Sequence, residues 1–299
     1  MIPLRCILLR DGDLTVGVAP ECGGALTRFD VRVCNQIVNI LRPADERSSG
    51  RPCALGASSF PLVPYAGRLR GGRFQFDGRD YCYPLNAFPE RHSSHGDGWT
   101  RRWDLVDLGR QTATMSLEPD SAAPLRYRCR QEISVHESRV RITLSVENLE
   151  AQRMPFGVGL HPYFANRSQA LIKASLPIRW QWDSELMPIA TEVNPLASDL
   201  AIGKRASFMP FASEFTGWDG SAVISWPALQ VRVELRTTPP LRHVVMWMPE
   251  GESFFCFEPI GHATDALNPN AGHPAADDFM ILEPGASLVQ DFDFRVSVG

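Results

Sequence analysis

The recurring pattern in this chain is an alternation of apolar and polar residues with a period of two. Within Arg139–Glu147 four apolar residues alternate with polar ones, and Leu229–Arg236 repeats the scheme. Such alternation places the apolar side chains on one face of an extended segment, so both are predicted to be strands with one buried face. Around Asp77-Gly78, the runs Arg73–Phe76 and Arg79–Tyr83 predict a hairpin, because this dipeptide favours the positive φ angles of a two-residue turn.

Further short apolar runs are separated by turn residues. The 23 glycines and 24 prolines are scattered along the chain and leave few windows for a long helix. Strands at this spacing, without alternating helices, indicate antiparallel sheets packed as a sandwich or barrel and disfavour a parallel α/β fold. The further predicted strands are 2–9, 14–18, 26–33, 103–108, 113–117, 125–135, 223–226, 244–248 and 254–257.

The domain organisation follows from the evenness of this pattern. No internal repeat and no Ser-rich, Gly-rich or charged linker interrupts it, and only Thr191–Arg205 suggests a helix or a long loop. We therefore expect one all-β domain over residues 1–299. With 44% hydrophobic residues, a chain of this length can bury a large core, which excludes a disordered chain or a small disulfide-stapled scaffold.

Charge and cysteine content narrow the class of protein further. The 30 basic and 34 acidic residues give a formal net charge of −4, and the basic residues form no run, so we expect no nucleic-acid partner. We also expect no membrane association, because no apolar run approaches ~18 residues and the N-terminal segment does not resemble a signal peptide. The seven cysteines are odd in number and include no Cys-x-x-Cys pair, so they are expected to be buried free thiols in a cytoplasmic protein.

Several common chemistries lack their usual motifs. The chain contains no Gly-x-Gly-x-x-Gly after a strand, no phosphate-binding Gly-x4-Gly-Lys-Ser/Thr, no His-Glu-x-x-His and no Gly-x-Ser-x-Gly. Nucleotide-dependent chemistry and serine hydrolysis are therefore not indicated.

Two ionisable residues are placed alike, each in an apolar run and directly before a proline. His161 lies in Pro155–Phe164, and Glu258 lies in Ser253–Pro259. Since proline cannot donate to a sheet ladder, both residues are expected at a strand end or bend. Apolar surroundings raise the proton affinity of a carboxylate and make it a better base near neutral pH. Taken alone, each residue is better explained as a hydrogen-bonded structural group, but the repeated construction gives an acid–base role equal weight.

The segment Arg91–Trp99 is predicted to be a loop whose small residues allow close approach to a ligand. His92, His95 and Asp97 are residue types that bind Zn²⁺, but a structural zinc site normally needs four ligands, so no metal is expected. Trp99 would be either a core residue or a flat surface for a sugar ring.

Arg68 lies among glycines in the segment 64–74. These glycines would allow its guanidinium to present a fixed fork toward a hydroxyl group or an anion. The alternative is a surface arginine in a turn.

Taken together and in this order, four motifs resemble those of the aldose 1-epimerase (galactose mutarotase) family. They are Phe60–Phe74, which contains Arg68; His95–Trp99 with Trp103; Gly159–Phe164; and Phe257–Ile260 with Asp265–Asn268. They extend over residues 60–268, and the strand-rich flanks also fit. The resemblance implies a large antiparallel β-supersandwich with a cleft on one sheet. It further implies interconversion of the α and β anomers of a free aldose such as a hexose, without a cofactor.

The same resemblance implies roles for individual residues. Glu258 matches the family's general base, His161 its general acid and His95 its second active-site histidine. Arg68 matches the arginine that contacts sugar hydroxyls. The partner would then be a small sugar, and the protein a monomer or a homodimer.

Aromatic and acidic residues would complete the sugar site. Trp99 and Tyr163 would pack against apolar faces of the sugar. Many family members place an aspartate shortly before a Phe to bind a substrate hydroxyl, whereas this chain has Ala or Ser there. Either Glu214 or Asp219 would then take its place or the site would be more open, so the sequence does not determine the preferred sugar.

Two other functions fit the same motifs. A hexose-6-phosphate 1-epimerase would use arginines near the motifs, but relatives of that kind carry His-Gly-Phe-Ala-Arg, and Trp99 stands at the position of that arginine. A carbohydrate-binding or sensing module would keep the cleft without turnover, although all the matched ionisable residues are present. The arginines in question are Arg68, Arg70, Arg73, Arg101 and Arg102.

Overall fold

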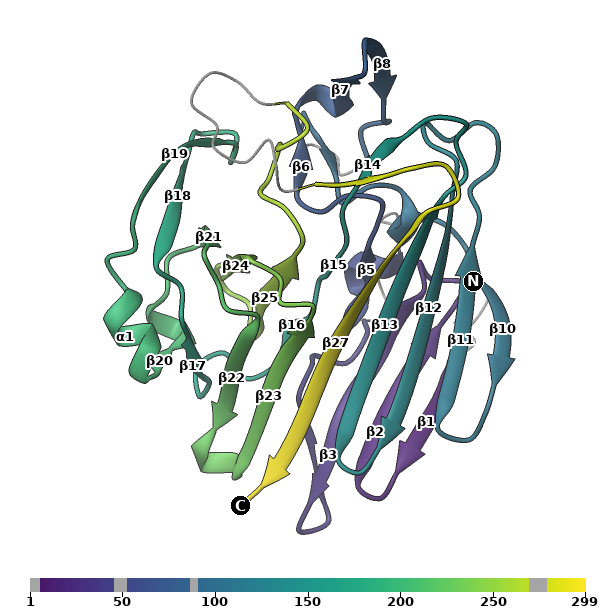
Figure 1. Ribbon diagram of the computed structural model, residues 1–299. Coiled ribbons are helices and arrows are strands. Elements are labelled where there is room, and N and C mark those ends of the chain that lie inside the picture. The colour runs from purple at the N-terminus through teal and green to yellow at the C-terminus, as the bar shows by residue number, and fades with distance from the viewer. Residues whose placement is uncertain (1–5, 46–52, 87–90, 269–278) are drawn as a thin grey trace.

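The structure, a computed structural model, describes residues 6–45, 53–86, 91–268 and 279–299. Its regular structure is almost entirely antiparallel β-sheet, arranged in layers (Figure 1). The predicted fold class, an all-β supersandwich of large antiparallel sheets, is confirmed. No helix in these described residues is long and apolar enough to cross a membrane.

The largest sheet has nine strands, each antiparallel to its neighbours. Figure 1 shows its long strands side by side, with the C-terminal strand in the middle of the sheet. In spatial order they are β10 (Asp104–Leu108), β11 (Thr112–Leu117), β12 (Tyr127–His136), β13 (Arg139–Asn148), β27 (Ser287–Val298), β23 (Val231–Thr238), β22 (Ser221–Trp226), β17 (Leu171–Ala174) and β20 (Lys204–Arg205).

The period-two pattern of the sequence becomes the inner face of this sheet. In β13 the apolar residues at positions 140, 142, 144 and 146 are buried and the alternate positions are more exposed. Burying each such side chain contributes roughly 1.5–3 kcal/mol relative to exposure. The alternation therefore fixes which face of the sheet meets the core, because a one-residue slip would expose every apolar side chain.

Two smaller sheets lie against this face. One has four strands: β1 (Ile7–Asp11), β2 (Leu14–Ala19), β3 (Ala25–Val33) and β4 (Gln36–Asn39). The other has eight strands in the order β19 (Pro188–Val193), β18 (Ile178–Trp182), β21 (Ala212–Thr216), β24 (His243–Trp247), β25 (Phe255–Ile260), β15 (Gly159–Leu160) and β5 (Pro61–Leu62), with β16 (Tyr163–Phe164) also pairing β25.

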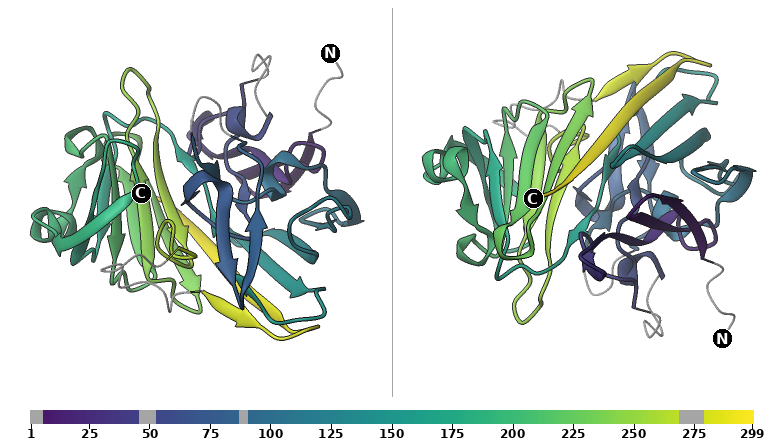
Figure 2. Two further views of the ribbon diagram at one scale, coloured as in Figure 1. Left: turned by 90° about the horizontal axis from the view of Figure 1, so that it is seen from above. Right: turned by 90° about the horizontal axis from the view of Figure 1, so that it is seen from below.

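Aromatic contacts join these layers. Phe29 of β3 meets Phe294 of β27 edge to face, with ring centroids 5.9 Å apart. On the other half of the large sheet, Trp226 of β22 lies 6.4 Å from Phe164 of β16 and donates its indole N–H to the Ala165 carbonyl at 3.0 Å. In the end-on views of Figure 2, the purple N-terminal strands lie against the teal strands of the nine-stranded sheet.

Short elements complete the fold. The predicted hairpin is confirmed as β7 (Arg73–Phe76) and β8 (Arg79–Cys82), with Asp77 and Gly78 both at positive φ. Two further strand pairs are β6 (Arg68–Leu69) with β9 (Ser93–Ser94), and β14 (Met154–Phe156) with β26 (Met280–Leu282). The helices are α1 (Ala197–Ile202) and the 3₁₀ turns η1 (Cys53–Gly56), η2 (Arg70–Gly72), η3 (Gly98–Thr100), η4 (Ala206–Phe208) and η5 (Pro227–Leu229).

The predicted elements differ from the structure in some places. The segment Thr191–Arg205, expected to be a helix or a long loop, contains the short helix α1, and residues 2–5 of the strand predicted over 2–9 lie outside the described residues. The strands β17 to β19, the strand β21 and the long C-terminal strand β27 are not among the predicted strands.

The prediction that all seven cysteines are buried free thiols is wrong. Cys22 and Cys53 form a disulfide, and Cys6, Cys34 and Cys82 are exposed thiols. An odd number of cysteines leaves at least one thiol free but says nothing about pairs that the tertiary structure brings together.

Candidate active site

The two faces of the strand β25 pack against different apolar clusters. Phe255 and Phe257 point into the main hydrophobic core, whereas Cys256 and Ile260 belong to a second apolar cluster on the other side of the sheet. Glu258 alternates with the phenylalanines and so lies on the side of the second cluster. It is 2% exposed.

Glu258 is not at a strand end, contrary to the sequence prediction, because β25 continues through Pro259 to Ile260. Opposite it, β15 pairs with β25 only at Ile260, and β16 pairs only at Phe255 and Cys256. The missing N–H of proline therefore falls beside a break in the neighbouring strand.

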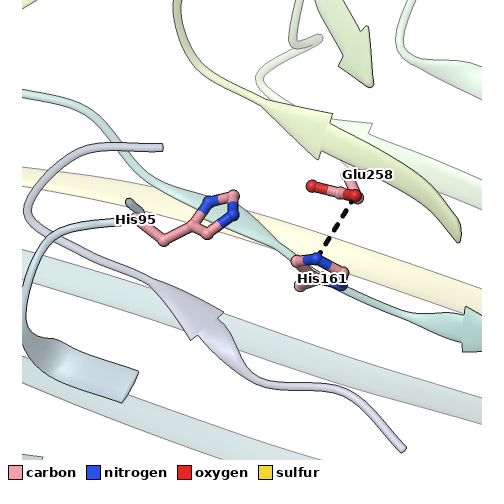
Figure 3. A group of neighbouring side chains, drawn as sticks. All are labelled: His95, His161 and Glu258. Carbon is pink, nitrogen blue, oxygen red and sulfur yellow. Dashed lines mark ion pairs between the residues drawn. The ribbon is translucent and has the colours of Figure 1, made fainter. Parts of the chain in front are cut away.

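His161 occupies that break. It follows the last residue of β15 and precedes β16, as predicted, and its backbone N–H donates to the Phe60 carbonyl at 3.0 Å. The break turns its imidazole toward β25, where Nε2 lies 3.4 Å from Oε1 of Glu258 (Figure 3). The two residues that the sequence placed before a proline are therefore brought into contact.

His95 reaches the same place from a loop that follows β9. Its backbone φ is 63°, in the left-handed region, and the N–H of His95 donates to the Gly67 carbonyl at 2.8 Å. In return the Gly67 N–H donates to Nδ1 of His95 at 3.1 Å. A neutral imidazole that accepts at Nδ1 carries its proton on Nε2. His95 can therefore donate a hydrogen bond within the cluster that it forms with His161 and Glu258. Its ring lies edge-on to that of His161, with centroids 5.3 Å apart.

Burial sets the protonation states of this cluster. Together with the smaller effect of the positive charge of Arg68, it lowers the pKa of His95 to about 3. Burial, with the neighbouring His95, also lowers the pKa of His161 well below its ordinary value. Burial raises the pKa of Glu258 to about 8, against the opposing effect of Arg68. Both rings are thus neutral at pH 7, and the carboxyl group titrates near the physiological range.

Two polar atoms of the contacting pair have no hydrogen-bond partner among the described residues. These are Oε2 of Glu258 and Nδ1 of His161, and both are buried. Buried polar atoms in folded proteins are almost always hydrogen-bonded. Both atoms can therefore form hydrogen bonds with polar groups of a bound molecule.

Glu214 lies beside this site and is completely buried on β21. Its Oε1 accepts the N–H of Thr264 at 2.8 Å, and burial raises its pKa. Burial and the negative charge of Glu214 both raise the pKa of Glu258. Of the two predicted replacements for the family aspartate, Glu214 is the one near the cluster.

Asp219 lies elsewhere. Its carboxylate is exposed and accepts the N–H and hydroxyl of Ser221 at 3.0 and 2.9 Å. It borders a hollow on the nine-stranded sheet together with Lys173 and Arg232. The structure therefore separates Asp219 from the residues with which the sequence grouped it.

The two aromatic candidates are buried. Trp99 is 1% exposed, stacks on Phe60 at 5.5 Å and donates its indole N–H to the Ser94 carbonyl. Tyr163 is 2% exposed, and its ring is stacked on His161 at 4.6 Å. Both side chains support the site from within the protein, so neither ring is placed as an open platform for a sugar.

The loop residues considered as zinc ligands are not brought together. Asp97 accepts hydrogen bonds from Arg101 and from the Tyr127 hydroxyl, each at 2.7 Å, and His92 accepts the N–H of Gly71 at 3.2 Å. Among the described residues, the side chains that could together hold a metal ion are instead those of His95, His161 and Glu258. Their ligand atoms lie within 4.8 Å of one another.

Sequence reasoning missed residues that support the site from behind. The N–H of Ala66 donates to Nε2 of His262 at 2.9 Å, which fixes the loop that precedes Arg68. Asp265 accepts the N–H of Arg70 and donates its own N–H to the Arg68 carbonyl. Asp265 begins the motif Asp265–Asn268, but no local pattern of the sequence predicts a structural role for it.

The whole chain is similar to proteins of one family. The aldose 1-epimerase family model matches residues 5–295. YphB, an uncharacterized protein of Escherichia coli K12, is 31% identical over 302 residues, which cover 96% of this chain and 97% of that protein.

Two crystal structures align with 98% of this chain. One, of an E. coli K12 protein provisionally assigned as an aldose 1-epimerase, has 30% identity, 99% of its own chain covered and a TM-score of 0.85. The other, of a galactose mutarotase-like protein from Clostridium acetobutylicum, has 19% identity, 95% coverage and a TM-score of 0.84. The fold is thus that of a family of sugar epimerases, and the chain belongs to the aldose 1-epimerase family.

The backbone next to His95 generates a first prediction. Gly96 has φ +66°, and a Cβ there would meet the Val63 carbonyl oxygen at 2.2 Å. Gly96→Ala should therefore lower the free energy of unfolding by roughly 3 kcal/mol or more, through strain and steric clash together. Gly12→Ala, at φ +54° with open space around it, should lose only about 1 kcal/mol. Urea denaturation of both variants checks this, and equal losses would contradict it.

The raised pKa of Glu258 generates a second prediction. The folded protein holds a proton on this carboxyl group up to about pH 8, whereas the unfolded chain releases it near its ordinary value of 4.5. Stability should therefore fall as pH rises between these values. Glu258→Gln removes this loss, so the variant should exceed the wild type in unfolding free energy by a few kcal/mol at pH 8 and by little at pH 5. A variant less stable at pH 8, measured by thermal and urea denaturation, would show that the carboxylate is a stabilising structural group.

Proposed function

We propose that this protein is an aldose 1-epimerase that interconverts the α and β anomers of a free hexose. The observation that carries the proposal is the buried contact at 3.4 Å between Glu258 and His161, two groups whose proton affinities burial shifts in opposite directions. Paired titratable groups with pKa values pushed apart are typical of acid–base catalysis. Family membership supports the same reaction class.

Anomer exchange needs one base and one acid at the same carbon. In the proposed mechanism Glu258 takes the proton of the C1 hydroxyl group while His161 gives a proton to the ring oxygen, and the bond between C1 and the ring oxygen breaks. The resulting aldehyde rotates about the C1–C2 bond. The ring then closes on the other face as the two proton transfers run in reverse. Both oxygens are bonded to C1, so adjacent acid and base groups can reach one each.

The remaining residues would orient the sugar. The Nε2–H of His95 would donate to the ring-oxygen region, and Arg68 would bind hydroxyl groups through its planar fork. Glu214 would bind a hydroxyl group with Oε2, which has no hydrogen-bond partner among the described residues. No metal or cofactor is required by the chemistry, because the reaction involves neither redox change nor energy input.

The proton count of the pair fits this mechanism. With a carboxyl group of raised pKa beside an imidazole of lowered pKa, the pair holds one proton at neutral pH. In the empty site burial favours the proton on Glu258. Sugar hydroxyl groups that donate to the carboxylate would shift it toward His161, because hydrogen bonds to the charged form favour that form. The pair then has one base and one acid at the same time.

The phosphorylated-sugar alternative receives less support. Arg70 contacts Asp265, Arg101 contacts Asp97 and Asp120, and Arg102 contacts Glu21. These arginines therefore already have carboxylate partners. A free sugar is accordingly the substrate class that we propose.

The acid–base roles can be tested by substitution. Glu258→Gln and His161→Ala should each lower kcat by about 10²–10⁴-fold, because each removes one proton-transfer group. Polarimetry on freshly dissolved α-glucose and α-galactose measures the rate over buffer. The exposed residues Glu118 and His136 provide controls, and Glu118→Gln and His136→Ala should leave kcat unchanged. Calorimetric sugar binding by the wild type without any acceleration would instead identify a binding module.

The pH dependence follows from the shared proton. Because the pKa of Glu258 is raised to about 8, kcat/KM should fall as pH rises through this value and the pair loses its proton. On the acid side activity should persist below pH 6.5, since the pKa of His161 is lowered. NMR saturation transfer, corrected for the buffer reaction, checks both limbs. If the enzymatic rate increases through pH 8, the active pair does not hold the one proton that the mechanism requires.

Substrate class is tested by comparing glucose with glucose 6-phosphate. We expect kcat/KM to be at least about tenfold higher for the free sugar, because Arg70, Arg101 and Arg102 already pair with carboxylates and a phosphate would lose hydration that the site does not fully replace. The comparison is made at constant ionic strength. A preference for the phosphate would select the alternative epimerase.

A further inference from the structure

The imidazole of His161 packs against two aromatic rings. Its ring centroid lies 4.7 Å from that of Phe60, with planes 27° apart, and 4.6 Å from that of Tyr163, with planes 29° apart. The Phe60 and Tyr163 centroids are themselves 6.1 Å apart, so the three rings form a compact group. The guanidinium carbon of Arg42 lies 3.6 Å from the Tyr163 ring centroid. A cation is thus stacked on a ring that supports the imidazole.

Arg42 is built into this position by several contacts. Its backbone N–H donates to the Tyr163 carbonyl at 2.8 Å, and its own carbonyl accepts the Ser58 hydroxyl at 2.6 Å. Its Nε donates to the Ala57 carbonyl at 3.1 Å, and Nη2 donates to the Leu55 carbonyl. Fixing two donors of a planar guanidinium fixes its plane. Lysine could not reproduce this geometry, because its single ammonium group has no plane.

The contacts of Arg42 do not include the reacting pair. Among the described residues they are backbone carbonyls and the rings of Tyr163 and Phe254, the latter at 4.2 Å. Cation–π contacts of this kind contribute about 0.5–2 kcal/mol, more when desolvated. Arg42 therefore affects the site through the Tyr163 ring that it contacts and through its charge.

We infer that Arg42 is a positioning residue that acts on His161 through the Tyr163 ring. The inference rests on the proposed function of His161 as a proton donor. Arg42 holds the Tyr163 ring, which packs against the imidazole, and so helps to fix the plane in which Nε2 meets Glu258. Its positive charge also disfavours a second positive charge on His161, which makes the imidazolium a stronger acid toward a weakly basic ring oxygen.

Other charged groups face His161 and set the background for this effect. Burial and the neighbouring His95 lower the pKa of His161, and Arg42 and Arg68 lower it further. Removing Arg42 should therefore raise this pKa while the other groups stay in place. The titratable or charged groups that face the ring are Glu258 on β25, His95 after β9, Arg68 on β6, Tyr163 on β16 and Arg42 after β4.

The test compares four variants of the full-length protein. Arg42→Met removes the charge and the donors, Arg42→Gln removes the charge but keeps N–H donors for the carbonyls, and Arg42→Lys keeps the charge without the planar fork. Arg153→Met is the matched control, because Arg153 lies 5.9 Å from the Phe76 ring on the β7–β8 hairpin. Folding is checked by thermal denaturation. The readouts are the ¹⁵N and ¹H signals of the His161 ring against pH, and kcat and KM at pH 7 and along the acid limb.

We expect both neutral variants to begin protonating His161 about 0.5–1 pH unit higher than the wild type. The acid limb of kcat/KM should move by the same amount, and kcat at pH 7 should fall about tenfold with little change in KM. Arg42→Lys should restore the titration but recover kcat only in part. Arg153→Met should change neither readout.

The inference is overturned if a folded Arg42→Met or Arg42→Gln protein shows the wild-type ring titration and the wild-type kcat. Should neither neutral variant fold, full kcat in Arg42→Lys overturns it and a reduced kcat with unchanged KM supports it. A wild-type protein that has no epimerase activity would refute the proposed function instead. The ring titration would then still decide whether Arg42 acts on His161.

Discussion

The site depends on keeping a carboxyl group and an imidazole in contact where water is excluded. A buried charge is costly, and burial shifts the protonation equilibrium of each group toward its neutral form. Glu258 and His161 experience this in opposite directions, so one proton serves both at neutral pH. The same burial that reduces the stability of the folded protein gives the pair a proton affinity suited to proton exchange.

The sheet makes this contact possible through an interruption of its own ladder. Glu258 faces away from the main core because it alternates with Phe257, and the neighbouring strand breaks at the point where His161 stands. The His161 ring packs against Phe60 and Tyr163 of the second apolar cluster, so it lies on the face of the sheet to which Glu258 points. Proline at position 259 fits beside the break, since no N–H is needed there.

A strained backbone at His95 and ring stacking at His161 restrict the motion of the side chains around this contact. His95 is held at positive φ by reciprocal hydrogen bonds with Gly67, an arrangement that costs about 1 kcal/mol or more and persists only where the surroundings impose it. The His161 ring packs against both Phe60 and Tyr163. Rings that cannot rotate keep their nitrogen atoms aimed at one point, which is the geometric requirement for proton transfer in a small site.

Local patterning of the sequence determined the all-β class, the 73–83 hairpin and most long strands, because a period of two and a turn dipeptide act over a few residues. It also marked His161 and Glu258 through their apolar runs and prolines, and the motif resemblance added His95 and Arg68. Only the tertiary structure decided that Glu258 lies within a strand, that Glu214 and not Asp219 adjoins the pair, that Trp99 and Tyr163 are buried, and that Cys22 meets Cys53. These are contacts between segments far apart in the chain, and the side chain that a distant strand presents is set by register and layer packing, which no local pattern encodes.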